Sequence, residues 1–371
     1  MTQIFPHASI RKSPFHSATV DEGATTFHAY NRMLLPLGYG DPEAEYRRLT
    51  EGVSMWDVSA QRQVQLRGPD AADLAQMLCP RDLSSCVEGQ GKYVALCDHA
   101  GHLINDPVVL KVADDCFWFS IADSDIWLWA TCVAAERGLD VEITEPDVSP
   151  LAVQGPLAES VVASIFGEWV RGLKYFWFAD AEVDGIPVKV ARSGWSKQGG
   201  FELYLMDGRR GGELWSIVRE AGVPWNIGPG YPNPSERIES GLLSWGGDVD
   251  ATTNPFEVRL GRFVDLDVPD DVVGIHALRR IAADGPTRHQ LGVVMAGDEP
   301  RPGHDRWYDV LAEGRSVGRL TNGIWSYKLN RNVGYGLVSV DCQIGDEVKI
   351  AKGDTLIDAK LTPLPFRKDD R

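Results

Sequence analysis

The sequence is poor in basic residues, has no long apolar run and has no paired cysteine motif. Its 371 residues include 37 Lys and Arg against 53 Asp and Glu, which gives a formal net charge of −16. No run of Lys or Arg is longer than a pair, so nothing predicts a basic patch for nucleic acid. No apolar stretch reaches the roughly 18 residues that predict a membrane-spanning helix. We therefore expect neither nucleic acid nor a membrane as a partner.

The six cysteines are scattered and form no C-x-x-C pair. The first residues also lack the basic and then apolar layout of a secretory signal. Both features predict reduced, mostly buried thiols and a cytoplasmic location. Cys97, Asp98, His99 and His102 lie close together, but no second cluster of ligands accompanies them. We interpret residues 98–101 as a hairpin turn and predict no metal site.

Nucleotide and acyl-hydrolase motifs are also missing. Glycines at 38–40 and 228–230 do not continue into a dinucleotide loop, and neither a Walker loop nor a G-x-S-x-G elbow occurs. The elements that are present mix hairpin-like strands with helices, without regular βαβ alternation, which predicts an α+β fold.

Helix signals are strong in the first three quarters of the chain. Asp41 followed by Pro42 predicts a helix to about Gly52, and residues 123–125 should cap a helix that ends near Gly138. Residues 234–245 also show helical spacing. After Thr287 the helix signals fade, and short strands alternate with glycine turns, which predicts a β-barrel or sandwich at the carboxyl end.

Two acidic residues stand out as candidates for chemistry. Asp106 lies between apolar strand residues just past a turn, so it is either a turn cap or a buried carboxylate that orients a basic nitrogen. Glu202 and Tyr204 follow a glycine-bearing loop and share one face of a strand. Glu202 is either solvated on an ordinary hairpin or accepts paired N–H donors from a flat heterocycle.

Aromatic residues are plentiful, with 12 tryptophans. Residues 175–178 form an aromatic run close to Trp169, and such runs belong to a core more often than to a ligand site. Tyr30, Lys92 and Tyr93 are further isolated candidates, since an aromatic ring can face a cation.

In order and spacing, several segments resemble the glycine-cleavage T-protein, or aminomethyltransferase, family. They are residues 55–59, 67–71, 105–106, 152–156, 194–202, 236–241 and 320–335. Within the family, other segments resemble the dimethylsulfoniopropionate demethylases. These are residues 29–36, 80–84, 91–94, 103–108, 120–125, 145–152 and 196–202. The loop 194–198 reads GWSKQ, where aminomethyltransferases carry G-Y-T-G-E, which disfavours a lipoyl-bound aminomethyl donor.

The resemblance implies a T-protein-like cloverleaf with two intertwined α+β subdomains, here residues 10–285, and a C-terminal β-barrel, residues 286–371. It implies a methyltransferase that moves a methyl group from the sulfonium of dimethylsulfoniopropionate to N5 of tetrahydrofolate, without metal or flavin. The products would be 3-(methylthio)propanoate and 5-methyltetrahydrofolate.

The resemblance also implies residue roles. Asp106 matches the catalytic carboxylate near the folate nitrogen, and Glu202 matches the pterin-binding acid. The other folate-binding candidates are Tyr204, Trp195, Trp169 and Arg237. The substrate-binding candidates are Tyr30, Lys92, Tyr93 and Trp195.

Alternative functions stay open at this point. They are a folate-dependent demethylase acting on a betaine, an N-methyl amine or an aryl methyl ether, an aminomethyltransferase, and a non-catalytic folate-binding protein. The expected partners are a small methylated sulfonium zwitterion and tetrahydrofolate, and assembly into a homodimer is left open.

Overall fold

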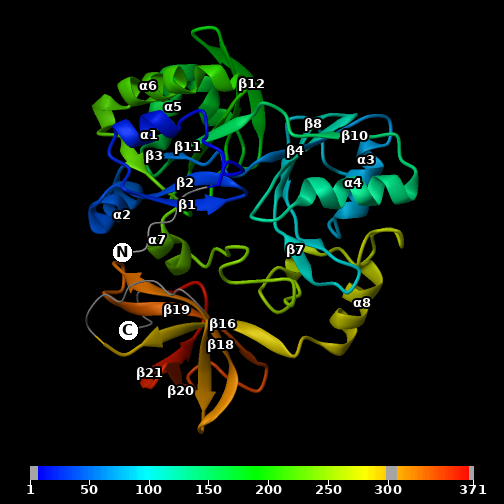
Figure 1. The fold of residues 1–371 in the computed structure, drawn as a ribbon, viewed down its shortest axis with the longest axis vertical. Helices are drawn as coiled ribbons and strands as arrows, with labels where there is room; N and C mark the ends of the chain where they lie inside the picture. Colours follow the sequence, from blue (N-terminus) through cyan, green and yellow to red (C-terminus); the bar gives the residue numbers. More distant parts are fainter. Residues whose placement is uncertain (1–6, 298–306, 367–371) are drawn as a thin grey trace. The chain divides into compact units, whose positions relative to one another are not determined.

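The computed structural model describes residues 7–297 and 307–366 of the chain. The chain divides into two compact units, and each is assembled from segments that are separated in sequence (Figure 1). The first unit comprises Met1–Ala75, Ser85–Lys92 and Pro107–Asn233, and the second comprises Gln76–Ser84, Tyr93–Asp106 and Pro234–Arg371. Within the described ranges, no helix is long and apolar enough to span a bilayer.

A six-stranded sheet, counted over the described residues, organises the main core of the first unit. Its order is β12-β13-β14-β11-β3-β15, and only the β15–β3 pair is parallel. The strands are β3 (Ser54–Asp57), β11 (Ser149–Gln154), β12 (Phe178–Val183), β13 (Ile186–Ala191), β14 (Gly200–Leu205) and β15 (Gly228–Gly230). Because β11 has a partner on each side and helices pack on the sheet, all of its residues are buried.

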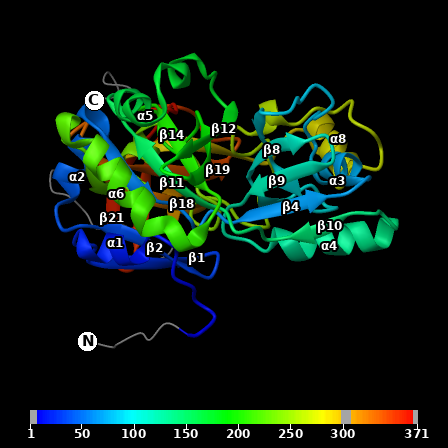
Figure 2. The ribbon, with the colours of Figure 1, turned by 90° about the horizontal axis from the view of Figure 1, so that it is seen from above.

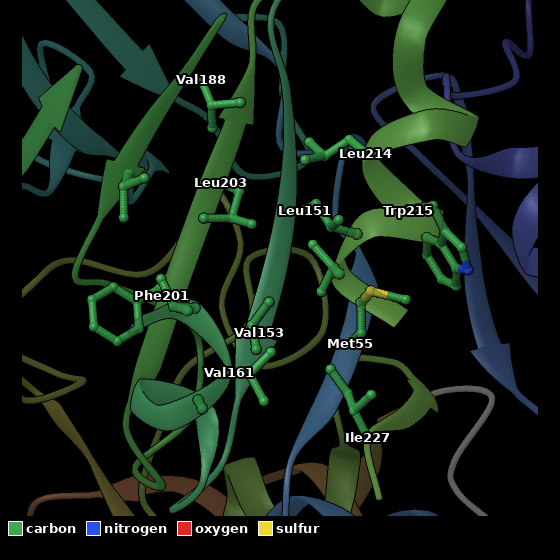
Figure 3. Close-up of a cluster of buried hydrophobic side chains, with 14 of the residues drawn as sticks. Met55, Leu151, Val153, Val161, Val188, Phe201, Leu203, Leu214, Trp215 and Ile227 are labelled. Atoms are coloured by element: carbon green, nitrogen blue, oxygen red, sulfur yellow. The ribbon is translucent and has the colours of Figure 1, made fainter. Parts of the chain in front are cut away.

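Helices α5 (Ala158–Phe166) and α6 (Gly211–Ala221) cover this sheet. Val161, Leu214 and Trp215 from the helices join Leu151 and Leu203 from the strands in one apolar cluster (Figure 3). Each such side chain contributes about 1.5–3 kcal/mol when fully buried. The cluster therefore anchors β14, the strand that carries Glu202. Short 3-10 helices connect these elements: η1 (Glu168–Gly172), η2 (Gly208–Arg210) and η3 (Val223–Trp225).

A second sheet has the order β10-β4-β9-β8-β5, and its strands lie in the first unit except for Tyr93 at the end of β5. Its strands are β4 (Gln63–Arg67), β5 (Gly91–Tyr93), β8 (Val108–Ala113), β9 (Cys116–Ser120) and β10 (Glu142–Thr144), with α3 (Ala71–Leu78) and α4 (Ile126–Arg137) beside them. Asp125 caps α4 by accepting the Leu128 N–H at 3.2 Å, and Gly138 ends it with a left-handed φ of 66°. The prediction of this helix from its capping residues is confirmed.

The amino-terminal segment forms α1 (His16–Asp21), the hairpin β1 (Thr26–Tyr30) and β2 (Met33–Gly38), and α2 (Pro42–Glu51). Asp41 caps α2 by accepting the Ala44 N–H at 3.0 Å, as its position before Pro42 predicts. All six cysteines are free thiols and five are buried, as expected.

Over the residues that the structure describes, the second unit combines a short hairpin, helical segments and a closed barrel. The hairpin strands are β6 (Leu96–Cys97) and β7 (Leu103–Asn105), and the helices are α7 (Pro234–Glu239), η4 (Gly261–Phe263) and α8 (Ile275–Asp284). The barrel strands are β16 (Arg288–Met295), β17 (Tyr308–Ala312), β18 (Arg315–Ser326), β19 (Arg331–Ser339), β20 (Glu347–Lys352) and β21 (Thr355–Thr362). The turn predicted at 98–101 is confirmed, since Gly101 N–H donates to the Asp98 carbonyl at 3.0 Å.

The α+β class and the carboxyl-terminal barrel are confirmed, but the helix predicted over 234–245 is wrong. It ends at Glu239, and Gly241 then takes a left-handed φ of 76°. The hydroxyl of Tyr335, in β19, lies 3.0–3.1 Å from the carbonyl oxygens of Arg237, Ile238 and Leu242. The carbonyls of Arg237 and Ile238 also accept the Leu242 and Gly241 N–H groups at 2.8 and 3.2 Å, so a glycine turn ends the helix and the Tyr335 hydroxyl adds a contact to the same carbonyls.

Candidate functional site

Asp106 follows the last residue of β7, within the second unit. Its Oδ2 atom accepts a hydrogen bond from the Tyr93 hydroxyl at 2.8 Å, and the side chain is half-buried. Burial raises the pKa of Asp106 to about 7, the charge of Asp248 also raises it, and the Tyr93 hydrogen bond lowers it. Asp106 is thus a carboxyl group that can change protonation state near neutral pH.

Tyr93 is held from two sides. Its ring meets Phe263 edge to face with centroids 5.0 Å apart, and its carbonyl accepts the Arg81 Nη1–H at 2.7 Å. Burial, followed by the charge of Asp106, places the pKa of the Tyr93 hydroxyl well above its usual value. Tyr93 therefore stays neutral and serves Asp106 as a fixed donor.

Arg237 forms a buried ion pair with Asp248 Oδ2, which also accepts the Ser244 N–H at 2.8 Å. Asp248 is 0% exposed, and its Oδ1 atom has no hydrogen-bond partner among the described residues. Asp248 was missed by sequence reasoning, because an acid after two glycines has the local signature of a turn.

Glu202 lies in β14 of the first unit and is 5% exposed. Its Oε2 atom accepts hydrogen bonds from the Ser193 hydroxyl and, at 3.3 Å, from the Tyr204 hydroxyl. Burial raises the pKa of Glu202, and these two donors lower it. The shared face predicted for Glu202 and Tyr204 is confirmed. Both hydrogen bonds that the carboxylate accepts within the described ranges use Oε2, which leaves Oε1 for a ligand.

The loop before Glu202 is fixed by Gln154, the last residue of β11. Its Nε2 atom donates to the carbonyls of Ser193 at 3.0 Å and Phe201 at 3.2 Å, and its Oε1 accepts the Ser196 hydroxyl at 2.8 Å. A Cβ at Gly194 would lie 2.0 Å from Gln154 Nε2, and Gly194 has φ 147°. Only glycine fits there without displacing Gln154.

The other site residues predicted from the sequence lie in the first unit and differ in their burial and contacts. Trp195 and Lys92 are half-buried, and Lys92 Nζ donates to the Ser85 hydroxyl at 2.8 Å. Tyr30 packs against the apolar cluster of Met33, Leu35 and Ala60.

Trp169 is 42% exposed, and its indole N–H donates to the Phe166 carbonyl at 2.6 Å. Tyr204 is 1% exposed, so its ring belongs to the core and its hydroxyl reaches Glu202. Tyr175 belongs to the aromatic run for which a core position was favoured, yet it is 54% exposed. Partial burial of its hydroxyl, followed by the charge of Glu202, raises the pKa of Tyr175.

The candidates therefore form two clusters. Asp106, Tyr93, Arg237 and Asp248 belong to the second unit, and Glu202, Tyr204, Ser193 and the 194–198 loop belong to the first. Across the part of the chain that the structure describes, no group of three or more His, Cys, Asp or Glu side chains could hold a metal ion. The clusters supply carboxylates with raised pKa values, neutral donors and aromatic rings.

Comparisons with known proteins decide the family. Residues 15–268 match the family model described as the GCVT N-terminal domain, and residues 288–368 match that of the glycine cleavage T-protein C-terminal barrel domain. The chain belongs to the glycine cleavage T-protein family.

Among its relatives, the chain is 42% identical over 338 residues to the dimethylsulfoniopropionate demethylase DmdA of Ruegeria pomeroyi, covering 91% of this chain and 92% of the relative. It is 32% identical to an aminomethyltransferase of Clostridium botulinum, covering 82% and 84%. The crystal structure of the glycine cleavage system aminomethyltransferase T from Bartonella henselae superposes with a TM-score of 0.84 at 21% identity, covering 97% and 99%, and confirms the T-protein-like fold.

The family relationship supports a transferase that uses tetrahydrofolate to accept a methyl or aminomethyl group. It also supports small molecules as ligands.

Proposed function

We propose that this T-protein family member is a tetrahydrofolate-dependent demethylase of dimethylsulfoniopropionate. The observation that carries the proposal is its 42% identity to a dimethylsulfoniopropionate demethylase across 91% of the chain, against 26–32% for aminomethyltransferase relatives. The GWSKQ sequence of the loop 194–198 adds support, because aminomethyltransferases differ there.

In the proposed reaction, the N5 lone pair of tetrahydrofolate attacks the sulfonium methyl carbon. The C–S bond breaks, and its electron pair leaves with the neutral thioether, 3-(methylthio)propanoate. N5 becomes a protonated tertiary amine and then loses its proton, giving 5-methyltetrahydrofolate. Because the donor is already electrophilic, the protein chiefly has to align the two reactants, which can contribute about 7–11 kcal/mol.

Asp106 is the catalytic residue in this proposal. Its ionised carboxylate would orient the folate and stabilise the positive charge that develops on N5. With a pKa of about 7, it could also receive the N5 proton after transfer. The hydrogen bond from the Tyr93 hydroxyl to Oδ2 would hold this carboxylate in place.

Glu202 is the proposed pterin-binding residue. A buried carboxylate with Oε2 occupied and Oε1 available suits the N–H donors of a pterin ring, so the described residues fit the folate. We assign Ser193 and Tyr204 to holding Glu202, and Trp195 and Trp169 to the walls of the folate site. We also assign Arg237 to folate binding, and its ion pair with Asp248 would hold its side chain in place.

The donor pocket is proposed from Tyr30, Lys92, Tyr93 and Trp195. Aromatic rings favour a sulfonium cation by roughly 0.5–2 kcal/mol each, and Lys92 would pair with the substrate carboxylate. A methylated nitrogen cation such as a betaine would use the same groups, and it is the second candidate donor. In this proposal the enzyme is cytoplasmic, needs no metal or flavin, and comprises a catalytic region at residues 10–285 and a barrel domain at residues 286–371.

A substrate panel tests the proposal. Purified enzyme is incubated with tetrahydrofolate and either dimethylsulfoniopropionate, glycine betaine, an N-methyl amine or an aryl methyl ether, and methylated folate is measured by mass spectrometry. We expect 5-methyltetrahydrofolate with dimethylsulfoniopropionate and no added metal. Turnover of betaine alone would overturn the donor assignment, and no folate product from any donor would overturn the demethylase assignment.

A further inference from the structure

Arginines gather around one aromatic ring in the second unit. The guanidinium carbons of Arg81 and Arg262 lie 5.2 and 4.7 Å from the centroid of the Phe263 ring, and Arg259 precedes Arg262 by three residues. A contact with an aromatic face holds a guanidinium in place without neutralising its charge. The fold therefore assembles a basic cluster in a chain whose net charge is −16.

The local sequence turns two of these arginines outward. Leu260 and Val264 are buried in an apolar cluster against which Phe263 packs, whereas Arg259 and Arg262 are exposed. Arg259 has a left-handed φ of 65°, which residues other than glycine rarely adopt. Such backbone strain persists only where the surrounding structure imposes it, and it is found most often at ligand-binding and active sites.

The guanidinium of Arg259 is held by neutral acceptors. Its Nε and Nη2 atoms donate to Gln290 Oε1 at 3.2 and 3.0 Å, and Nη2 also donates to the Gly241 carbonyl at 3.0 Å. Among the described residues, none accepts a hydrogen bond from Nη1. Because neither acceptor carries a charge, the side chain is fixed while its positive charge stays uncompensated.

No carboxylate within the described ranges forms an ion pair with Arg259 or Arg262. Asp248 pairs with Arg237 instead. Partial burial lowers the pKa of Arg259 and the charge of Arg262 lowers it further, whereas Asp248 raises it. The two guanidinium groups therefore repel each other, and an anion bound between them would relieve that repulsion.

The two arginines lie close to the candidate catalytic carboxyl group. Tyr93, which donates to Asp106, packs its ring edge to face on Phe263 with centroids 5.0 Å apart. Burial and Asp106 raise the pKa of the Tyr93 hydroxyl, and the charges of Arg262 and Arg259 act against that rise. Two cations at this place would repel a sulfonium and attract an anionic group of a reactant.

We propose that Arg259 and Arg262 form an anion-binding subsite for the glutamate carboxylates of tetrahydrofolate. The inference rests on the proposed function, which supplies folate as the methyl acceptor. A planar guanidinium binds a carboxylate through two parallel hydrogen bonds. The donor also carries a carboxylate, but both arginines are exposed, which suits a charged tail that reaches solvent better than a donor enclosed with N5. Each further glutamate adds a carboxylate and should strengthen binding.

Calorimetric titration of the full chain tests the subsite with three ligands. They are tetrahydrofolate with one glutamate, tetrahydrofolate with three glutamates, and 6-methyltetrahydropterin, which lacks the tail. We expect the triglutamate to bind most tightly, and its affinity to fall as ionic strength rises above about 0.1 M. Arg262→Gln should raise the dissociation constants of both tailed ligands about 3- to 10-fold and leave that of 6-methyltetrahydropterin unchanged. Arg262→Lys keeps the charge and should retain part of the affinity.

Arg280→Gln is the matched control. It removes the same charge from the second unit, and Arg280 is exposed on helix α8, which is labelled in Figure 2. This variant should leave all three dissociation constants unchanged. Because Arg262 forms no hydrogen bond with a described residue, thermal unfolding of Arg262→Gln should match that of the wild type.

The possible results separate the subsite from the proposed function. If wild-type protein binds tetrahydrofolate and Arg262→Gln binds it equally well, or loses 6-methyltetrahydropterin to the same extent, the subsite is wrong while folate binding stands. A raised KM for dimethylsulfoniopropionate with unchanged folate affinity would assign the arginines to the donor carboxylate and overturn the tail assignment. Wild-type protein that binds none of the three ligands would refute the proposed function, and the subsite with it.

Discussion

The Tyr93 hydroxyl donates a hydrogen bond to Oδ2 of Asp106 across thirteen residues of chain, at 2.8 Å. Tyr93 lies at the end of β5, and Asp106 lies just after β7. The bond favours the ionised carboxylate, whereas burial and Asp248 favour the protonated acid. The balance keeps the pKa of Asp106 near neutrality, where either form is accessible.

Replacing Asp106 with Asn separates catalysis from stability. We expect turnover to fall by about 100-fold or more, since a preorganised charge is removed from the developing N5 cation. Because folding raises the pKa of Asp106, ionising this carboxyl destabilises the folded protein, and the contribution of Asp106 to stability should fall as pH rises from about 4 through about 7. Asp106→Asn should therefore be more stable than wild type at pH 8, by roughly 1–3 kcal/mol, and gain nothing at pH 4.

Urea unfolding at both pH values, together with the rate of methylfolate formation, measures these two effects. Asp98→Asn is a suitable control, because Asp98 belongs to the hairpin turn. Wild-type turnover in the Asp106→Asn enzyme would remove its proposed role.

Replacing Tyr93 with Phe should move the acid limb of the pH–rate profile to higher pH. The Tyr93 hydrogen bond lowers the pKa of Asp106, so its loss raises that pKa above about 7. Activity that needs ionised Asp106 then appears only at higher pH, and raising the pH should restore part of the rate. The measurement is kcat/KM against pH, with the barrel variant Tyr308→Phe as control. An unchanged limb would show that Asp106 does not set it.

Local signals in the sequence were enough to predict much of the fold. Asp41 before Pro42 and Asp125 before an apolar helix both act within one turn, and the structure confirms both caps. Strand alternation likewise placed Glu202 and Tyr204 on one face. The end of α7 has a local signal in Gly241, which the helical spacing of residues 234–245 outweighed in the prediction, whereas the contact of Tyr335, almost a hundred residues later, with the carbonyls at which the helix stops has no local signal.

The candidate site shows the same division. The family resemblance selected Asp106 and Glu202 and gave Tyr93 a role toward substrate, but it did not indicate that the Tyr93 hydroxyl donates to Asp106. Asp248 was not selected, because its burial arises from the ion pair with Arg237 and not from any local pattern. Contacts between distant segments, and the pKa values that follow from them, require the folded chain.

The ion pair between Arg237 and Asp248 should stabilise the fold only when both partners are present. Breaking a buried ion pair by removing one partner costs about 3–5 kcal/mol, because the other charge stays buried. We expect Asp248→Asn and Arg237→Met each to lower the free energy of unfolding by that amount. The double variant should lose less than the sum of the two. Urea unfolding of all four proteins at pH 7 completes the cycle, and strict additivity would show that the pair is not coupled.

Replacing Glu202 with Gln should weaken folate binding while leaving the fold intact. The Gln side chain keeps one carbonyl oxygen for Ser193 and Tyr204, but it presents an NH₂ group where the pterin needs an acceptor. Hydrogen bonds to a charged group are worth about 1.5–3 kcal/mol, so the dissociation constant for tetrahydrofolate should rise roughly 10- to 150-fold. Calorimetric titration with tetrahydrofolate measures this constant, and thermal unfolding checks the fold. Glu182→Gln is the matched control, since Glu182 is exposed on β12 of the same sheet. Equal affinity in the wild-type and Glu202→Gln proteins would show that other residues bind the pterin. Binding that is weakened equally in the Glu202→Gln and Glu182→Gln proteins would point to a long-range charge effect instead.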